Sequence, residues 1–147
     1  MRKKTELVLA VQYVCQDAQL PTRPQIRRWV RAAQERPVQT TIRFVDADEG
    51  QALNRAYRGK DYATNVLSFV YESAPTVTGD LVICVPVVLR EATAQGKPVK
   101  AHMAHLIVHG MLHLQGYDHE TGQREASRME EKEREVLAHF GIPDPYQ

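Results

Sequence analysis

Four short segments of the chain are rich in Val, Ile and other β-branched residues or alternate apolar and polar positions. A two-residue alternation places successive side chains on opposite faces of an extended chain, as in a half-buried β-strand. Branched side chains also fit the pleated surface of a sheet. We therefore predict four strands, over residues 7–14, 40–45, 66–71 and 80–85.

Five further segments are predicted to be helices, mainly from the residues at their ends. Thr22 and Asp46 are suited to cap a first turn, Pro86 to open one, and Gly96 and Gly141 to end one. The predicted helices run from the Thr22 cap to about residue 34, and over about 47–57, 86–95, 99–114 and 123–140.

Strands and helices then follow one another in the order β-α-β-α-β-β-α-α-α, and no linker or internal repeat divides the chain. This order is typical of an α+β fold with α/β-like layers, in which helices pack on a mixed sheet. We expect a single domain over residues 1–147, built from a mixed sheet of about four strands and about five helices.

Apolar runs in the chain are too short for a membrane span, which needs about 20 apolar residues. The N-terminal segment also lacks the clean apolar core of a signal peptide. Cys15 and Cys84 are isolated in the sequence and are expected to be buried free thiols, as is usual in a reducing compartment. We therefore expect a cytoplasmic protein with no membrane partner.

The net charge of +1 hides an uneven distribution of charge. Residues 1–60 hold 12 Lys and Arg against 6 Asp and Glu, a net charge of +6, whereas residues 61–147 hold 7 against 12, a net charge of −5. Such a basic half favours a polyanionic partner, although a plain solvated helix face fits equally well. Four arginines in this half recur at helical spacing: Arg23, Arg27, Arg28 and Arg31.

A run of histidines near the C-terminal end predicts metal chemistry. His109 and His113 stand four residues apart, on one face of the helix predicted over 99–114, and His119 follows beyond a glycine. This is the spacing of the zinc metalloprotease signature H-E-x-x-H-x-x-G-x-x-H, except that Gly110 replaces the catalytic glutamate. The pattern predicts a zincin-like metal helix without the base that a peptidase needs.

Three histidines recur at intervals of four, so a ligand set has to be chosen. His105 and His113 are separated by about 12 Å of helix rise, at about 1.5 Å per residue, whereas zinc–nitrogen bonds are only about 2 Å long. One ion can therefore be held by neighbouring members of the row but not by both ends. Because Gly116 can break the helix, His119 can fold back toward it. We expect one metal ion bound by His109, His113 and His119.

Three neutral imidazoles with further positions open describe a catalytic metal site, because structural zinc sites close with four protein ligands. One zinc ion per chain fits the ligand type best, and nickel, copper or iron also accept imidazole. Asp118 and Glu120 flank the third ligand and either orient a histidine through its other nitrogen or are solvated loop carboxylates. His102 and His105 are expected in polar packing or on the wall of the site, and His139 on the exposed side of the last helix.

Gly110 lies inside a predicted helix, where glycine costs about 1 kcal/mol relative to alanine. Two reasons for it are open at the level of sequence: another backbone approaches closely, or the space above the metal is kept clear for a bulky substrate. In the metalloprotease frame a glutamate at this position would point toward the metal, so we expect Gly110 to face the site.

A second dense motif covers residues 53–69, L-N-R-A-Y-R-G-K-D-Y-A-T-N-V-L-S-F. Arg58 and Lys60 flank a glycine in a predicted loop, where Arg can bind phosphate through two hydrogen bonds and Lys as a point charge. Together with H-G-M-L-H-L-Q-G-Y-D-H and the strand entry G-D-L-V-I, this motif closely resembles the YbeY family of bacterial endoribonucleases. The family pattern is approximately L-N-x-x-Y-R-G-K-D-x-P-T-D-V-L-S-F-P, from which this chain differs at Ala63, Asn65 and Val70.

The resemblance spans roughly residues 40–142 and implies a metal-dependent endoribonuclease that acts on single-stranded rRNA. The family is associated with maturation of the 16S rRNA 3′ end and with ribosome quality control. It implies that His109, His113 and His119 hold a zinc ion and that Arg58 is required for cleavage. The partners would be rRNA and the small ribosomal subunit, with no DNA expected. Flanking phosphates would be held by basic residues of the first half, namely Lys60, Arg23, Arg27, Arg28 and Arg31.

Other functions remain open from the residues alone. A metal-dependent hydrolase of a small molecule would need a closed pocket and would not need the basic helix. A non-enzymatic ribosome assembly factor would use the metal structurally, which the open coordination position of the expected site argues against. A peptidase is disfavoured because Gly110 replaces the glutamate. The last helix could supply a distant carboxylate, although its run of acidic residues is more typical of a solvated face: Glu130, Glu131, Glu133 and Glu135.

Overall fold

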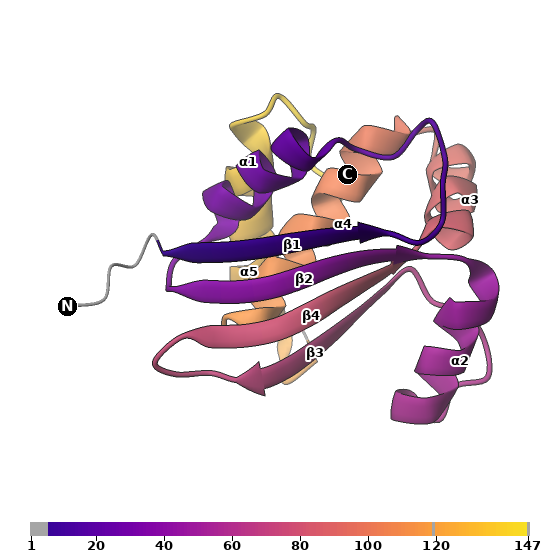
Figure 1. Ribbon diagram of the computed structural model, residues 1–147. Coiled ribbons are helices and arrows are strands. Elements are labelled where there is room, and N and C mark those ends of the chain that lie inside the picture. Colours follow the sequence, from indigo (N-terminus) through magenta and orange to yellow (C-terminus); the bar gives the residue numbers. More distant parts are fainter. Residues whose placement is uncertain (1–5, 119, 147) are drawn as a thin grey trace.

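The computed structural model describes residues 6–118 and 120–146, and within them the chain forms one four-stranded sheet (Figure 1). The strands are β1 (Leu7–Tyr13), β2 (Val38–Val45), β3 (Val66–Glu72) and β4 (Val77–Cys84). Their order across the sheet is β1-β2-β4-β3, with β1, β2 and β4 parallel and β3 antiparallel to β4. The sheet is therefore mixed, and β3 forms one of its edges.

Five helices within the described residues join and cover the strands. They are α1 (Arg23–Ala33), α2 (Ala47–Arg58), α3 (Val85–Gln95), α4 (Val99–Leu114) and α5 (Gln123–Ala138). The prediction of an α+β fold with a mixed sheet of about four strands and about five helices is confirmed, and so is the order of the elements.

Local signals set the ends of the first two helices. The Thr22 hydroxyl accepts the backbone N–H of Gln25 at 3.3 Å, and the Gln25 side chain accepts the backbone N–H of Thr22 at 2.9 Å. This capping box satisfies backbone donors that the first turn of α1 leaves unpaired. Gly59 ends α2 in the left-handed conformation, with φ of 70°. The helix therefore includes Arg58, which the sequence had assigned to a loop.

Two strands begin earlier than the sequence pattern predicts. β2 starts at Val38 instead of residue 40, and β4 at Val77 instead of residue 80. In the register of the sheet Leu7 lies opposite Val38, and Val38 opposite Val77. Backbone hydrogen bonds to a neighbouring strand thus extend both strands beyond their alternating segments, which a single segment cannot reveal.

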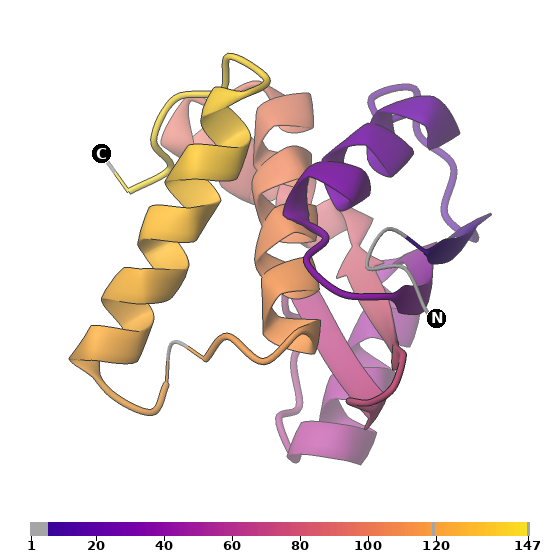
Figure 2. The ribbon, with the colours of Figure 1, turned by 90° about the vertical axis from the view of Figure 1, so that its left-hand side faces the viewer.

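α4 lies at the centre of the helical layer. It packs against α1, α3 and α5 and against strands β3 and β4, and Figure 2 shows it running between α1 and α5. The main apolar core lies between these helices and the sheet, and includes Phe44, Leu81, Ile107 and Leu137. A helix buried on so many sides is apolar around most of its surface, as α4 is.

A second, smaller apolar cluster lies on the opposite face of the sheet, where Leu53 of α2 packs against Leu67 and Cys84. Cys84 is buried and Cys15 is half-buried, and both are free thiols as expected, although Cys15 is less buried than expected. Among the described residues, no helix is both long enough and apolar enough to cross a membrane.

Gly110 lies on the side of α4 that packs against strand β4 of the sheet. A Cβ atom at this position would stand 2.7 and 2.9 Å from the two terminal carbons of Leu81 on β4, nearer than carbon atoms pack. The expectation that Gly110 faces the metal site is therefore wrong, because the position faces the apolar core. Glycine is present because a neighbouring element approaches closely, although the approaching group is a side chain and not a backbone.

We predict that Gly110→Ala lowers the free energy of unfolding, even though alanine is the better helix former. Overpacking a core typically costs about 1–3 kcal/mol, and the gain in helix propensity returns about 1 kcal/mol. We therefore expect a net loss of about 1 kcal/mol in denaturant unfolding. The loss should shrink in a Leu81→Val background, which makes room for the added methyl. An alanine variant as stable as the parent in both backgrounds would show that α4 and β4 have space between them.

Candidate active site

One surface groove brings together the residues that the two sequence motifs singled out. The groove has a volume of about 550 Å³ and runs between the end of α2, the edge strand β3 and the second half of α4. Its lining includes Arg58 from α2 and residues 66–71 of β3, and also His109, His113 and Glu120. The two motifs, which are distant in sequence, thus meet at one edge of the sheet.

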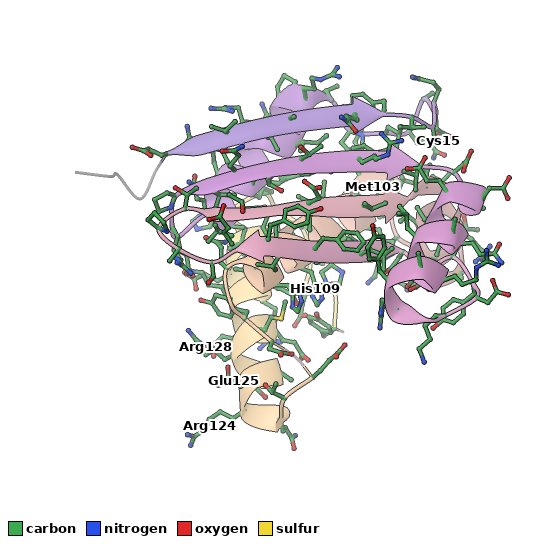
Figure 3. The ribbon with its side chains drawn as sticks, turned by 60° about the horizontal axis from the view of Figure 1, so that its bottom comes forward. Cys15, Met103, His109, Arg124, Glu125 and Arg128 are labelled. Atoms are coloured by element: carbon green, nitrogen blue, oxygen red, sulfur yellow. The ribbon has the colours of Figure 1, made fainter. Side chains whose placement is uncertain are left out.

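His109 and His113 lie on successive turns of α4 and both line the groove. Figure 3 shows His109 beneath the β3 edge of the sheet, beside α5. His119, the expected third ligand, lies outside the described residues. Asp118 accepts the backbone N–H of Glu120 at 2.7 Å, which shapes the loop after α4. Any action of Asp118 or Glu120 on a ligand stays a prediction.

Glu133 of α5 lies directly behind His109 and is fully buried, with 0% of its side chain exposed. One carboxylate oxygen contacts Nδ1 of His109, and the other accepts a hydrogen bond from the Tyr146 hydroxyl. Nε2 of His105 stands 3.8 Å from the same carboxylate and 3.4 Å from the Tyr146 hydroxyl. Four polar groups from α4, α5 and the C-terminal segment thus meet around one buried carboxylate.

Burial by itself would raise the pKa of Glu133, but the neighbouring polar groups have the larger combined effect. Interactions with His105 and His109 and the hydrogen bond from Tyr146 lower the pKa of Glu133 to about 2. Burial and the adjacent Glu133 carboxylate raise the pKa of Tyr146, so its hydroxyl keeps its proton. Glu133 is therefore an ionised acceptor and Tyr146 a donor.

Three members of this cluster offer the chemistry of a metal site. The possible ligand atoms of His105, His109 and Glu133 lie within 4.8 Å of one another, so this group could hold a metal ion. Histidine nitrogens with one carboxylate are ligands that zinc and other transition metals accept. The structure thus supports metal binding on this side of α4.

The expectation that Glu133 lies on a solvated helix face is wrong. A signal for its burial exists in the sequence, since the buried positions of α5 are Met129, Glu133, Val136 and Leu137, spaced as an apolar helix stripe. Because the neighbouring residues of α5 are mostly charged, this spacing was not recognised as an apolar stripe. Tyr146 had no such signal, because only the folding back of the C-terminal segment brings it to Glu133.

The basic residues of the first half divide into two regions. Arg58 is exposed and lines the groove, and Lys60 is exposed just beyond it. A separate hollow of about 730 Å³ lies between α1 and the residues that follow α5, and it shares no lining residue with the groove. It is lined in part by Arg27, Arg28 and Arg31, and by His139, which is exposed as expected. The α1 arginines therefore do not share the groove with Arg58.

Aromatic side chains form the upper wall of the groove. Tyr57 and Phe69 meet edge to face, with ring centroids 5.1 Å apart. The hydroxyl of Tyr71 donates to Asp80 at 2.8 Å, and this tyrosine also lines the groove. Tyr57 and Tyr71 are 69% and 65% exposed, so both side chains are accessible to a ligand in the groove.

The amino-acid sequence is similar to those of known proteins over nearly its whole length. Residues 13–141 match the family model described as Endoribonuclease YbeY. The chain belongs to this family. A relative from Thiobacillus denitrificans, named Endoribonuclease YbeY, is 59% identical over 143 residues, which is 96% of this chain and 97% of the relative. One of the same name from Aromatoleum aromaticum is 60% identical over 129 residues, 88% of this chain and 83% of the relative.

The fold also matches a solved structure. The solution structure of TM1509 from Thermotoga maritima aligns with a TM-score of 0.64 at 26% identity, over 88% of this chain and 87% of that protein. The resemblance to the YbeY family that the two motifs carried is therefore confirmed, and the shared fold extends over most of the chain.

Asn65, where the YbeY pattern has aspartate, takes part in a polar chain behind the groove. Its amide donates to Glu91 of α3 at 3.1 Å, and Glu91 also contacts Nε2 of the buried His102 at 2.9 Å. The Asn65 side-chain oxygen accepts the backbone N–H of Val66 at 2.6 Å. An amide can donate to Glu91, whereas an ionised aspartate could not, so the asparagine suits this neighbour. His102 is thus in polar packing, one of the two alternatives expected.

Proposed function

We propose that this protein is a zinc-dependent endoribonuclease that cuts single-stranded stretches of rRNA. Its expected roles are maturation of the 16S rRNA 3′ end and ribosome quality control in the cytoplasm, with the small ribosomal subunit as partner. Membership of the YbeY endoribonuclease family supports the activity. The observation that carries the proposal is that Arg58, His109 and His113 line one groove.

We further propose that one zinc ion is held by His109, His113 and His119, although nickel or another transition metal would also suit imidazole ligands. The described residues fit such an ion. His109 and His113 offer imidazoles on one face of α4, and Glu133 contacts Nδ1 of His109. Nε2 is then the nitrogen of His109 that would bind the metal, which is the usual arrangement of a carboxylate behind a zinc ligand.

The group of His105, His109 and Glu133 is the alternative ligand set. Two ligands of one tetrahedral zinc ion, each at about 2.0–2.1 Å, stand about 3.3 Å apart. Nδ1 of His109 and a carboxylate oxygen of Glu133 instead lie directly against each other, as the two partners of a hydrogen bond do. This contact favours Glu133 as a partner of His109 over Glu133 as a second ligand of the same ion.

Arg58 has the chemistry to act on the phosphodiester itself. A bound zinc ion would supply Lewis-acid chemistry for hydrolysis of the phosphodiester. The guanidinium of Arg58 lies on the same groove and can donate two parallel hydrogen bonds to a phosphate. We propose that it binds the scissile phosphate and stabilises the negative charge that grows in the transition state.

Open aromatic rings suit a single strand better than a duplex or a small molecule. Unpaired bases can stack on exposed rings such as those of Tyr57 and Tyr71, whereas bases inside a helix cannot. A small-molecule hydrolase would favour an enclosed pocket, and this groove lies open along a sheet edge. A peptidase is disfavoured because Gly110 faces Leu81 and offers no position for a base.

The remaining basic residues are proposed as secondary RNA contacts. Lys60 is exposed near the groove, and the α1 arginines line their own hollow on another part of the surface. A large substrate such as a ribosomal subunit could contact both regions at once. Such contacts with phosphates would be independent of sequence and sensitive to salt. They involve Arg27, Arg28 and Arg31, with Arg23 at the start of the helix.

Arg58→Ala is predicted to lower the cleavage rate of a single-stranded rRNA fragment by about 10²–10³-fold, as expected for loss of a transition-state donor. A chelator should abolish cleavage by the parent protein. Arg58→Lys should recover only part of the rate, because it keeps the charge but loses the fork. Arg55→Ala is the matched control, since Arg55 is exposed on the same helix and pairs with Asp61. A fully active Arg58→Ala protein would remove Arg58 from the reaction.

His113→Ala is predicted to lose nearly all bound metal, whereas His105→Ala should keep it. The reason is that His113 belongs to the proposed ligand set and His105 only to the cluster around Glu133. Metal content of the purified variants, measured by atomic emission, distinguishes the two sets. Loss of metal in His105→Ala with retention in His113→Ala would assign the ion to His105, His109 and Glu133.

Tyr57→Leu is predicted to weaken binding of single-stranded RNA about tenfold, because a stacked base contributes about 1–3 kcal/mol. The effect should appear in KM more than in kcat, since the ring does not touch the reacting phosphate. Tyr62→Leu provides the control, because Tyr62 is 56% exposed but lies outside the groove lining. Equal effects of the two substitutions would argue against a base-stacking wall.

A further inference from the structure

Glu133 is the one carboxylate among the described residues that is fully buried. Burying an ionised carboxylate is costly unless charged or hydrogen-bonded partners compensate for the lost water. Both oxygens of Glu133 have such partners, in His109 and Tyr146. Both carboxylate oxygens of this buried charge thus have polar partners, and the charge lies directly behind His109 of the groove. Packing alone does not explain such an arrangement.

The contact with His109 determines which ring nitrogen carries the proton. An ionised carboxylate can only accept hydrogen bonds, so Nδ1 of His109 must be the donor. Nε2 of His109 is then the acceptor nitrogen, as a metal ligand must be.

Tyr146 holds the other end of the carboxylate. Its ring stacks edge to face on His105 with centroids 5.5 Å apart, and its hydroxyl donates to Glu133. The backbone N–H of Tyr146 donates to Asp144 at 2.8 Å, and Asp144 stands 3.8 Å from Arg134 of α5. The C-terminal segment is thus tied back to α5 at the point where Tyr146 meets Glu133.

We propose that Glu133, locked in place by Tyr146, is the positioning residue for His109. It fixes the protonated Nδ1 and the ring orientation, so that Nε2 is presented to the metal. The inference rests on the proposed role of His109 as a metal ligand, but it does not depend on RNA being the substrate. It gives α5 and the C-terminal segment a part in the site although neither supplies a proposed ligand.

The test measures zinc affinity of metal-free protein by competition with a chromogenic chelator, so no RNA cleavage is involved. Glu133→Gln keeps the shape of the side chain but removes the charge, and is expected to weaken zinc binding about 10–100-fold. Tyr146→Phe should weaken it less, because Glu133 keeps its charge and its contact with His109 and loses only the hydrogen bond that helps to hold it. The visible spectrum of the cobalt-substituted protein should change in Glu133→Gln, since it reports the orientation of the ligands.

Matched controls separate this role from simple packing. Glu131→Gln removes an exposed carboxylate two residues away on α5, and Tyr62→Phe removes an exposed hydroxyl elsewhere. Both should leave zinc affinity and the cobalt spectrum unchanged. Thermal unfolding of the metal-free proteins checks that each variant is folded, and Glu133→Asp, which keeps the charge, should recover part of the affinity.

Two results would overturn the inference. Parental zinc affinity and an unchanged cobalt spectrum in Glu133→Gln would show that Glu133 does not position His109. Loss of zinc in Glu133→Gln as complete as in His109→Ala would make Glu133 a ligand instead. Failure of the proposed nuclease function looks different, because a protein that binds zinc as described but leaves RNA intact would contradict only that function.

Discussion

The close approach of α4 to the sheet is the constraint on which the rest of the structure depends. Two glycines make it possible, one on each element. Gly110 of α4 lies against Leu81, and a Cβ atom on Gly79 of β4 would stand 2.8 Å from a terminal carbon of Leu114. With the helix set this closely on the strand, its rotation is fixed, because any turn would drive a side chain into the core. His109 and His113 are thereby held on the side that lines the groove.

Three histidines of α4 lie close to carboxylates on the two helices that flank it. His102 contacts Glu91 of α3, whereas His105 and His109 share Glu133 of α5. A nearly all-apolar helix can carry these histidines because a carboxylate on a neighbouring helix lies close to one ring nitrogen of each. Helices α3 and α5 therefore do more than cover the core. They also supply the carboxylates that contact the histidines of α4 and offset the cost of burying them.

The groove exists because one edge of the sheet is left uncovered. Within the described residues β3 pairs with β4 alone, and its register shifts between Val70 and Glu72, an irregularity of the kind that discourages pairing with another chain. α2 ends beside this edge at Gly59, which leaves Arg58 and Tyr57 on the rim. An exposed edge with a cation, open rings and two histidines is a surface suited to an extended polymer.

The sequence by itself determined the order of the elements, the α+β class, the family and the two motifs. These depend on local information: the period of apolar positions, the residues at helix ends, and the fixed spacing of His109 and His113 on one helix face. The sequence also placed Arg58 and the histidines on separate segments, but it did not show that these segments meet in the folded protein. Their meeting in one groove is a property of the sheet order, which puts β3 beside α2 and α4.

Tertiary structure alone decided the direction in which Gly110 faces and the partners of His109. In the zinc metalloprotease signature a catalytic base stands at the position of Gly110. In the folded protein this position faces Leu81 in the core instead. Glu133 lies in a charged run that reads as solvated, and only the docking of α5 on α4 buries it. Tyr146 reaches it through the folding back of the C-terminal segment. Contacts between segments distant in the chain leave no periodic trace in either segment, so the cluster behind the site appears only in the folded protein.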